Sequence, residues 1–202
     1  ELRRVACIGQ GLSAQGEGGQ FGRLLADLGA DVIKVEPPWG EPWRLTQRFT
    51  ATESRTFMTY NRGKRSLPLD LTKDGAAEIL KRLIPEMDIA LVNFRPDVAA
   101  KLGVDYETLS AINPRLIYCA ISGFGQTGPW SQRPGFDLIA QAMGGVISGT
   151  GIPGAEPVKS GIPVGDLGAG MFACYGILSA VIGRERTGKG QYVDTSLLDA
   201  AL

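Results

Sequence analysis

Apolar and polar positions follow two alternating patterns along the chain. Short apolar runs, bounded by polar, glycine or proline residues, predict buried strands at "RRVACIG", "DVIKVE", "SLPLDL", "DIALVNF" and "RLIYCAISGFG". Between them apolar residues fall at helical spacing, most clearly in "GGQFGRLLADLGA", where positions 21, 24, 25 and 28 share one face. This rhythm predicts an α/β fold with a doubly wound, mostly parallel sheet.

Further helices are predicted at "KDGAAEILKRLIPEM", "PDVAAKLG", "DYETLSAIN" and "FDLIAQAMGGVIS", followed by a long apolar helix after Asp166. Gly188 is expected to end that helix, in the turn "RERTGKGQ". Two segments interrupt the pattern. Residues 37–56 are expected to form a loop in which Trp39 and Trp43 pack onto the protein. Residues 123–163, rich in Gly and Pro, are expected to form a connection that shapes a site.

The composition narrows the class of partner. The chain has 202 residues, with 21 basic and 21 acidic side chains, so its net charge indicates neither a nucleic-acid tail nor a membrane-binding patch. A compact metabolite is the more natural partner. The three cysteines lack a Cys-x-x-Cys pairing and lie in apolar runs, which is typical of reduced core thiols. Because no uninterrupted apolar run reaches about 18 residues and no signal peptide opens the sequence, we expect a cytoplasmic protein.

The sequence contains no histidine. The usual proton shuttle at neutral pH and the commonest transition-metal ligand are therefore missing, so no metal site is expected and carboxylates must carry any acid–base work. The sequence begins without methionine and stops inside the helical pattern "SLLDAAL", which suggests part of a longer polypeptide.

One short motif suggests a nicotinamide-dependent oxidoreductase. Gly9, Gly11 and Ala14 match the G-x-G-x-x-G/A spacing after a strand, and Glu36 ends the second strand, where it could hold a ribose hydroxyl. The helix should begin directly at that turn, yet "LSAQGEGGQ" inserts further flexible residues. This reading is kept as an alternative.

Asp166 stands at the start of the long apolar helix, within "GIPVGDLGAGMFACYGIL". Asp is among the preferred N-cap residues, so the local pattern alone favours a capping role. A carboxylate at a helix N-terminus is also held in its ionised form by the free N–H groups, which suits a nucleophile. Both roles stay open at this point.

Longer segments resemble one enzyme family. They are "LLADLGADVIKVEPP", "NRGKRSLPLDL", "VNFRP", "LGVDYETLSAINPRLIYCAISGFGQTGP", "RPGFDLIAQAMGG" and "VGDLGAGMFACYGILSAVIGRERTGKGQYVDTSLLDAAL". In this order they resemble the class III (CaiB/BaiF-type) coenzyme A transferases. The likeness weakens before Arg23, where "GEGGQ" replaces the family's Ala-Gly-Pro segment.

The resemblance implies a Rossmann-like large domain and a small domain in an interlocked homodimer. Residues 1–202 would be the N-terminal part of the large CoA-binding domain, ending in the long helix and linker region, with the C-terminal half and small domain absent. The aspartate at the position of Asp166 would be the nucleophile, moving CoA from an acyl-CoA to a carboxylic acid through aspartyl-anhydride and aspartyl-CoA thioester intermediates. Around it, Gly165, Gly168, Ala169 and Gly170 would leave room for the thioester, although each glycine costs roughly 1 kcal/mol of helix propensity.

The resemblance also implies which residues bind CoA, here a substrate rather than a tightly bound cofactor. After the third strand they are Leu69, Asp70, Leu71 and Thr72, and after the fourth strand they are Asn93, Phe94, Arg95 and Lys101. Phe136 and Asp137 would lie near the thioester. Lys101 would lie near the phosphates, and Arg95 suits a phosphate by charge. Lys101 could equally be a solvated surface lysine. Gly16 and Glu17 match a segment near the reacting carbonyl.

Phe136 bears on the subclass. The acyl-CoA racemases of this superfamily have a histidine there, as one of two bases at the α-carbon. With phenylalanine at that position, a racemase is disfavoured and transfer to a carboxylate is preferred. A lyase of the same superfamily and a non-enzymatic CoA-binding module remain alternatives.

Overall fold

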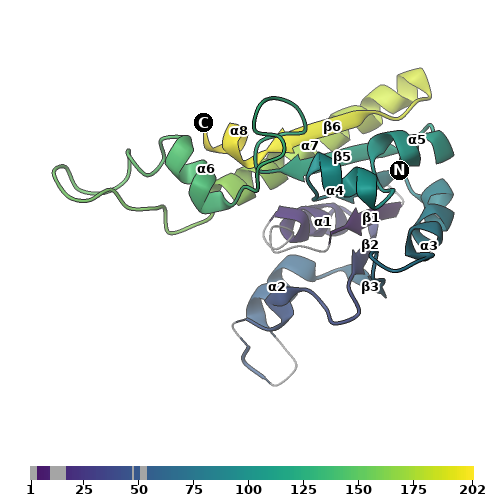
Figure 1. Cartoon of the computed structure of the whole chain (residues 1–202), viewed down its shortest axis with the longest axis horizontal. Helices are drawn as coiled ribbons and strands as arrows, with labels where there is room; N and C mark the ends of the chain where they lie inside the picture. Colours follow the sequence, from purple (N-terminus) through teal and green to yellow (C-terminus); the bar gives the residue numbers. More distant parts are fainter. Residues whose placement is uncertain (1–3, 10–16, 47, 51–53) are drawn as a thin grey trace.

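The sheet is parallel throughout its described part. The computed structural model describes residues 4–9, 17–46, 48–50 and 54–202. Within them the strands are β1 (Arg4–Ile8), β2 (Asp31–Glu36), β3 (Lys64–Pro68), β4 (Ile89–Val92), β5 (Ile117–Ser122) and β6 (Tyr192–Ser196). They pair in parallel in the order β3-β2-β1-β4-β5-β6 (Figure 1). This confirms the predicted Rossmann-like, doubly wound α/β fold.

Helices cover both faces of the sheet (Figure 1). One face packs against α1 (Glu17–Asp27), α7 (Val164–Thr187) and α8 (Leu197–Ala201). The other packs against α3 (Ala76–Leu83), η3 (Ile84–Glu86), α4 (Pro96–Lys101) and α5 (Tyr106–Ile112). Because successive side chains of a strand point to opposite faces, Val5 contributes to the first core and Ala6 to the second. Burial on both faces explains why these strands read as continuous apolar runs.

The three cysteines are free thiols in the protein interior. Cys7 lies on β1 and Cys119 on β5, with β4 between them, and Cys174 reaches the same core from α7. Burial raises the pKa of the Cys7 and Cys174 thiols above the usual value. The prediction of core thiols is therefore confirmed.

Two elements were missed by the sequence patterns. The first is α2 (Arg55–Asn61), which begins at the end of the expected loop 37–56, after the 3-10 turn η2 (Pro42–Arg44). Ser54 begins α2, since its hydroxyl accepts a hydrogen bond from the Phe57 N–H. Trp43 packs edge-on against Tyr60, as predicted, but the prediction for Trp39 is wrong because that side chain is 71% exposed.

The second missed element is β6, which pairs with β5 at the edge of the sheet. Its residues alternate between exposed and partly buried, and its sequence "YVDTS" carries only one aliphatic residue. An edge strand of this kind lacks the apolar run that marks the central strands.

The long helix α7 is a core helix. By length and composition alone it is apolar enough to span a membrane, although its apolar run between Asp166 and Arg184 stays below about 18 residues, as expected. In the structure it packs against β5, β6, α1 and α8, with Ala173 and Ile177 fully buried. It ends, as predicted, at Gly188, whose φ of 71° and N–H bond to the Arg184 carbonyl form a left-handed C-cap.

The connection from β5 to α6 (Asp137–Met143) contains a loop, residues 123–135, that is closed at its base by two glycines. A Cβ added to Gly123 would lie 2.5 Å from the Gly135 Cα, and the reverse distance is also 2.5 Å. The Gln126 N–H donates to the Asp194 carboxylate at 2.9 Å, and Arg95 donates to the Gln132 carbonyl at 3.1 Å. The loop is thus fixed against the ends of β4 and β6.

Replacing Gly123 with alanine should destabilise the protein. The added methyl would meet backbone atoms, which cannot move aside as a flexible side chain can, so we expect a loss of about 1–3 kcal/mol in the free energy of unfolding. Denaturant titration measures it. Gly161→Ala is the matched control, because nothing lies within 4 Å of a Cβ placed there. Equal stability of the two variants would contradict this account of the loop.

Candidate active site

A cavity of about 460 Å³ lies beyond the carboxyl ends of β4 and β5. In an open parallel sheet of this strand order, ligands bind at that edge. Six of the predicted CoA-binding residues line the cavity: Thr72, Asn93, Phe94, Arg95, Lys101 and Phe136. The structure therefore brings together residues that come from three separate connections of the chain.

The other residues predicted after the third strand do not line the cavity. The Asp70 carboxylate accepts hydrogen bonds from the Thr72 hydroxyl at 2.6 Å and its N–H at 3.0 Å, which lowers the pKa of Asp70. The Leu69 N–H donates to the Glu36 carbonyl, and Leu71 is buried in the core beneath α3 and α4. These three residues shape the turn that presents Thr72, and a direct role for them in CoA binding stays a prediction.

Sequence reasoning missed several lining residues, notably Ser122 and Arg133. Ser122 ends β5 and is 8% exposed, and its hydroxyl has no hydrogen-bond partner among the described residues. Arg133 lies over the Trp130 ring, 5.2 Å from its centroid. The strand-end rule could have found Ser122, whereas Arg133 reaches the cavity only because the glycine-closed loop folds back.

The cavity is cationic. Arg95, Lys101 and Arg133 are on its lining, and no described lining residue carries a carboxylate. Arg95 pairs with Asp97 at 3.4 Å, but both side chains are about half exposed, so this ion pair contributes little. The remaining wall is largely apolar, with Phe94, Phe136, Val98 and Leu102. Such a combination suits a ligand with both apolar and strongly anionic parts.

Asp166 does not cap its helix. It is the third residue of α7, and the N-cap position is Pro163. The cap comes instead from Asp137, whose Oδ1 accepts hydrogen bonds from the Gly165 N–H at 2.8 Å and the Asp166 N–H at 3.3 Å. The capping interpretation of Asp166 is therefore wrong. Asp137 directly follows Phe136, which lines the cavity, whereas neither Asp137 nor Asp166 is among the lining residues.

The glycines around Asp166 have a packing role. A Cβ on Gly165 would lie 3.2 Å from the Asp137 carboxylate and 3.3 Å from the Leu197 carbonyl, and one on Gly168 would lie 3.1 Å from the Ala200 Cβ. These positions face α6 and α8, not an open approach to the carboxylate. The prediction that Gly165 and Gly168 make room for the thioester is thus replaced by close helix packing.

The structure does not favour the nicotinamide alternative. Glu36 is 2% exposed, and its oxygens accept hydrogen bonds from Arg44 at 2.7 and 3.0 Å and from Ser66 at 2.6 Å. Burial would raise the pKa of Glu36, but these hydrogen bonds outweigh it and lower the pKa. The carboxylate is therefore engaged inside the protein. Gly11 and Ala14 lie outside the described residues, as does Gly16; Glu17 begins α1, and its side chain is not described.

A second, smaller cavity of about 30 Å³ lies where β1 and β4 meet, and it shares Asn93 and Ile121 with the larger one. Beside it is a buried polar cluster. Lys34 donates to Glu41 and, at 2.9 Å, to the Asn61 side-chain oxygen, which also accepts from Lys64 at 3.0 Å. Burial lowers the pKa of Lys64 to about 8. The space is suited to ordered water rather than a metabolite.

A family model described as CoA-transferase family III matches residues 5–202. The chain belongs to CoA-transferase family III. It is 42% identical over 186 residues to succinate–glutarate CoA-transferase of Agrobacterium fabrum, covering 88% of this chain and 46% of that protein. It is 44% identical over 187 residues to acetyl-CoA:oxalate CoA-transferase of Acetobacter aceti, covering 91% and 48%.

The solved structures agree with this assignment. A crystal structure of a CAIB/BAIF family protein from Brucella suis superposes with a TM-score of 0.90 at 42% identity, covering 99% of this family III chain and 53% of that one. The chain spans about half the length of the curated relatives it matches.

The buried Lys64 should make stability depend on pH. Its folded pKa of about 8 lies below the ordinary 10.5, so the unfolded chain binds more protons between these values and the free energy of unfolding rises with pH across that window. We expect the difference between wild type and Lys64→Met to shift by up to roughly 3 kcal/mol in favour of wild type from pH 8 to pH 10.5. Chemical denaturation at several pH values measures this. Lys73→Met, at an exposed lysine, is the control, and the expectation fails if both variants give the same pH dependence.

Proposed function

We propose that this chain carries the CoA-binding surface and the nucleophile of an acyl-CoA:carboxylate CoA-transferase. The observation that carries the proposal is the cationic lining of the cavity, formed by Arg95, Lys101 and Arg133. Asp166 lies in the first turn of a helix capped by Asp137, the residue that follows Phe136 of the lining. The names of the relatives support it, since each transfers CoA between acids.

In this proposal Arg95, Lys101 and Arg133 hold the phosphates of CoA. Guanidinium groups make strong charge-assisted hydrogen bonds with phosphate oxygens, and the ammonium of Lys101 adds a point charge. Phe94 and Phe136 give apolar surface to the neutral parts of the substrate. Because Phe136 adjoins Asp137, which contacts the start of α7, the thioester end is assigned to that side of the cavity.

The proposed reaction needs only Asp166 as a covalent group. Its carboxylate oxygen attacks the thioester carbonyl carbon, the C–S bond breaks, and CoA leaves as a thiolate, which gives an acyl-aspartyl anhydride. The thiolate then attacks the aspartyl carbonyl and releases the donor acid, leaving an aspartyl-CoA thioester. An acceptor carboxylate attacks that thioester, and the CoA thiolate returns to the acceptor's acyl carbon, which regenerates Asp166.

Among the subclasses, transfer is favoured over racemisation. Phe136 lines the cavity where a racemase would need a second base, and a phenyl ring cannot accept a proton. The relatives act on short dicarboxylic acids such as succinate, glutarate and oxalate, so we propose this class for the acids exchanged. We further propose that the whole protein is a cytoplasmic, interlocked homodimer. A lyase and a CoA-binding module without turnover are the other outcomes of the tests below.

Isotope labelling tests the nucleophile. The full-length protein, incubated with a panel of acyl-CoA donors and an oxygen-18 labelled acceptor acid, should gain oxygen-18 in the peptide that contains Asp166, because the bridging anhydride oxygen stays on the aspartate. Asp166→Ala should lose the label and lower transfer by on the order of 10³-fold or more. Asp74→Ala, at an exposed carboxylate far from α7 in sequence, is the control. Transfer without label at Asp166 would refute the anhydride route.

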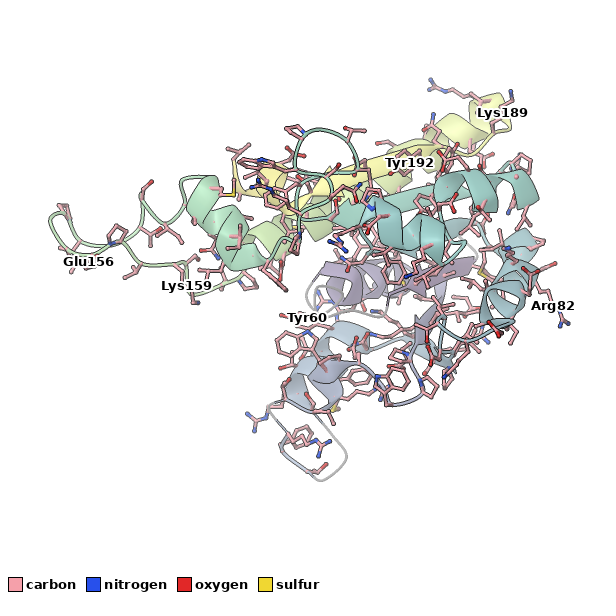
Figure 2. The ribbon with its side chains drawn as sticks, in the orientation of Figure 1. Tyr60, Arg82, Glu156, Lys159, Lys189 and Tyr192 are labelled. Carbon is pink, nitrogen blue, oxygen red and sulfur yellow. The ribbon has the colours of Figure 1, made fainter. Side chains whose placement is uncertain are left out.

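Calorimetric titration with CoA tests the cationic wall. Removing one charge that contacts a phosphate should weaken binding about tenfold, so we expect this of both Arg133→Met and Lys101→Met, with a smaller effect at high salt. Arg82→Met is the matched control, because Arg82 projects from the α3 side of the protein (Figure 2). Unchanged dissociation constants in both cavity variants would place CoA elsewhere.

A further inference from the structure

The segment that leads into α7 is an extended arm. Residues 144–163 leave α6, run outward past Glu156 and Lys159, and return to the start of α7 (Figures 1 and 2). Most of the arm is solvent exposed, including Ile152 at 78%. An arm of this kind gives the first turn of α7 little support, so contacts at its base must fix that turn.

One buried side chain links α6 to the base of the arm. Gln141 lies on α6 and is fully buried. Its Nε2 donates to the Asp137 Oδ2 at 2.5 Å and to the Ile162 carbonyl at 3.3 Å, and its Oε1 accepts from the Ser160 N–H at 2.9 Å. The carboxamide thus joins α6 to Ser160 and Ile162 of the returning arm. Only one orientation of the amide satisfies all three hydrogen bonds.

The contacts continue to the nucleophile. Asp137 receives the Gln141 amide on one oxygen and caps α7 with the other, through the N–H groups of Gly165 and Asp166. Gln141 is fully buried and is not on the lining of the larger cavity, so it offers no surface to a substrate. Within the described residues, it is linked to the start of α7 through Asp137 and through the returning arm.

We propose that Gln141 is a positioning residue for the transfer reaction, which fixes the first turn of α7 and thereby the direction of the Asp166 carboxylate. The inference rests on the proposed function. A misplacement of about 1 Å at a reacting group costs on the order of 100-fold in rate, so a residue without substrate contact has a large effect on turnover if it sets that geometry.

The test compares two hydrogen-bonded amides, Gln141 and the partly buried Asn113, in the full-length protein. Asn113 makes the same pattern of bonds at the amino edge of the sheet: its Nδ2 donates to the Ile84 and Met87 carbonyls, and its Oδ1 accepts from the Arg115 N–H. Gln141→Met and Asn113→Leu each remove three hydrogen bonds and keep the side-chain volume. Both should lower the melting temperature. Only Gln141→Met should lower kcat, by roughly 10- to 100-fold, with the Kd for CoA changed less than about twofold.

A second variant separates positioning from packing. In Gln141→Glu the new carboxylate faces that of Asp137, and the pKa of a buried carboxyl next to another is raised. Protonation restores a donor toward Asp137, so kcat of this variant should recover as the pH falls from about 8 to about 6, relative to wild type. Gln141→Met should show no such recovery, because it cannot donate at any pH.

Hydrogen exchange gives a readout that does not need activity. The Gly165 and Asp166 amides should exchange at least about tenfold faster in Gln141→Met than in Asn113→Leu or wild type. Unchanged exchange, or equal turnover of Gln141→Met and Asn113→Leu, would overturn the positioning role while the transferase proposal stands. Absence of transfer by wild type with every donor tested would instead refute the proposed function.

Discussion

The candidate site depends on a helix cap that comes from outside the helix. The first N–H groups of α7 have no partners within the helix, and Asp137 satisfies two of them from α6. The carboxylate of Asp166, which belongs to α7 itself, is therefore not needed to cap the first turn of the helix. The dipole and the free N–H groups of a helix start favour an anion, which is the environment that a carboxylate nucleophile requires.

This arrangement requires α6 and α8 to lie close to α7. Gly165 and Gly168 permit that approach. Glycine lowers the intrinsic stability of a helix, and the close packing against α6 and α8 compensates for this loss. On the other side of the site, Asn93 ties the end of β4 to the Ile121 carbonyl of β5 at 3.3 Å, so the cavity wall belongs to the rigid sheet. Binding groups on strand ends and a reactive group on a supported helix give a site whose two parts are positioned independently.

The fold could be predicted because the central strands are buried on both faces and so appear as apolar runs. That signal failed at β6, an edge strand with alternating burial, and at α2, where the buried residue is the polar Asn61 and not an apolar face. In the site, the cavity residues after β3 and β4 could be predicted because they follow directly, in sequence, on strands that the apolar runs identify. Arg133 was not predictable in this way, because the glycine-closed loop brings it to the cavity. The Asp137 cap was not predictable either, because 28 residues separate Asp137 from the Gly165 N–H that it accepts from.

The absence of histidine agrees with the chemistry proposed for this site. Each proposed step exchanges one anion for another: a carboxylate attacks and a thiolate leaves, or a thiolate attacks and a carboxylate leaves. The site then carries the same single negative charge throughout, and no proton has to be moved. What such a reaction needs is fixed dipoles and a fixed direction of attack, which a helix start held through Asp137 and Gln141 supplies without a general base.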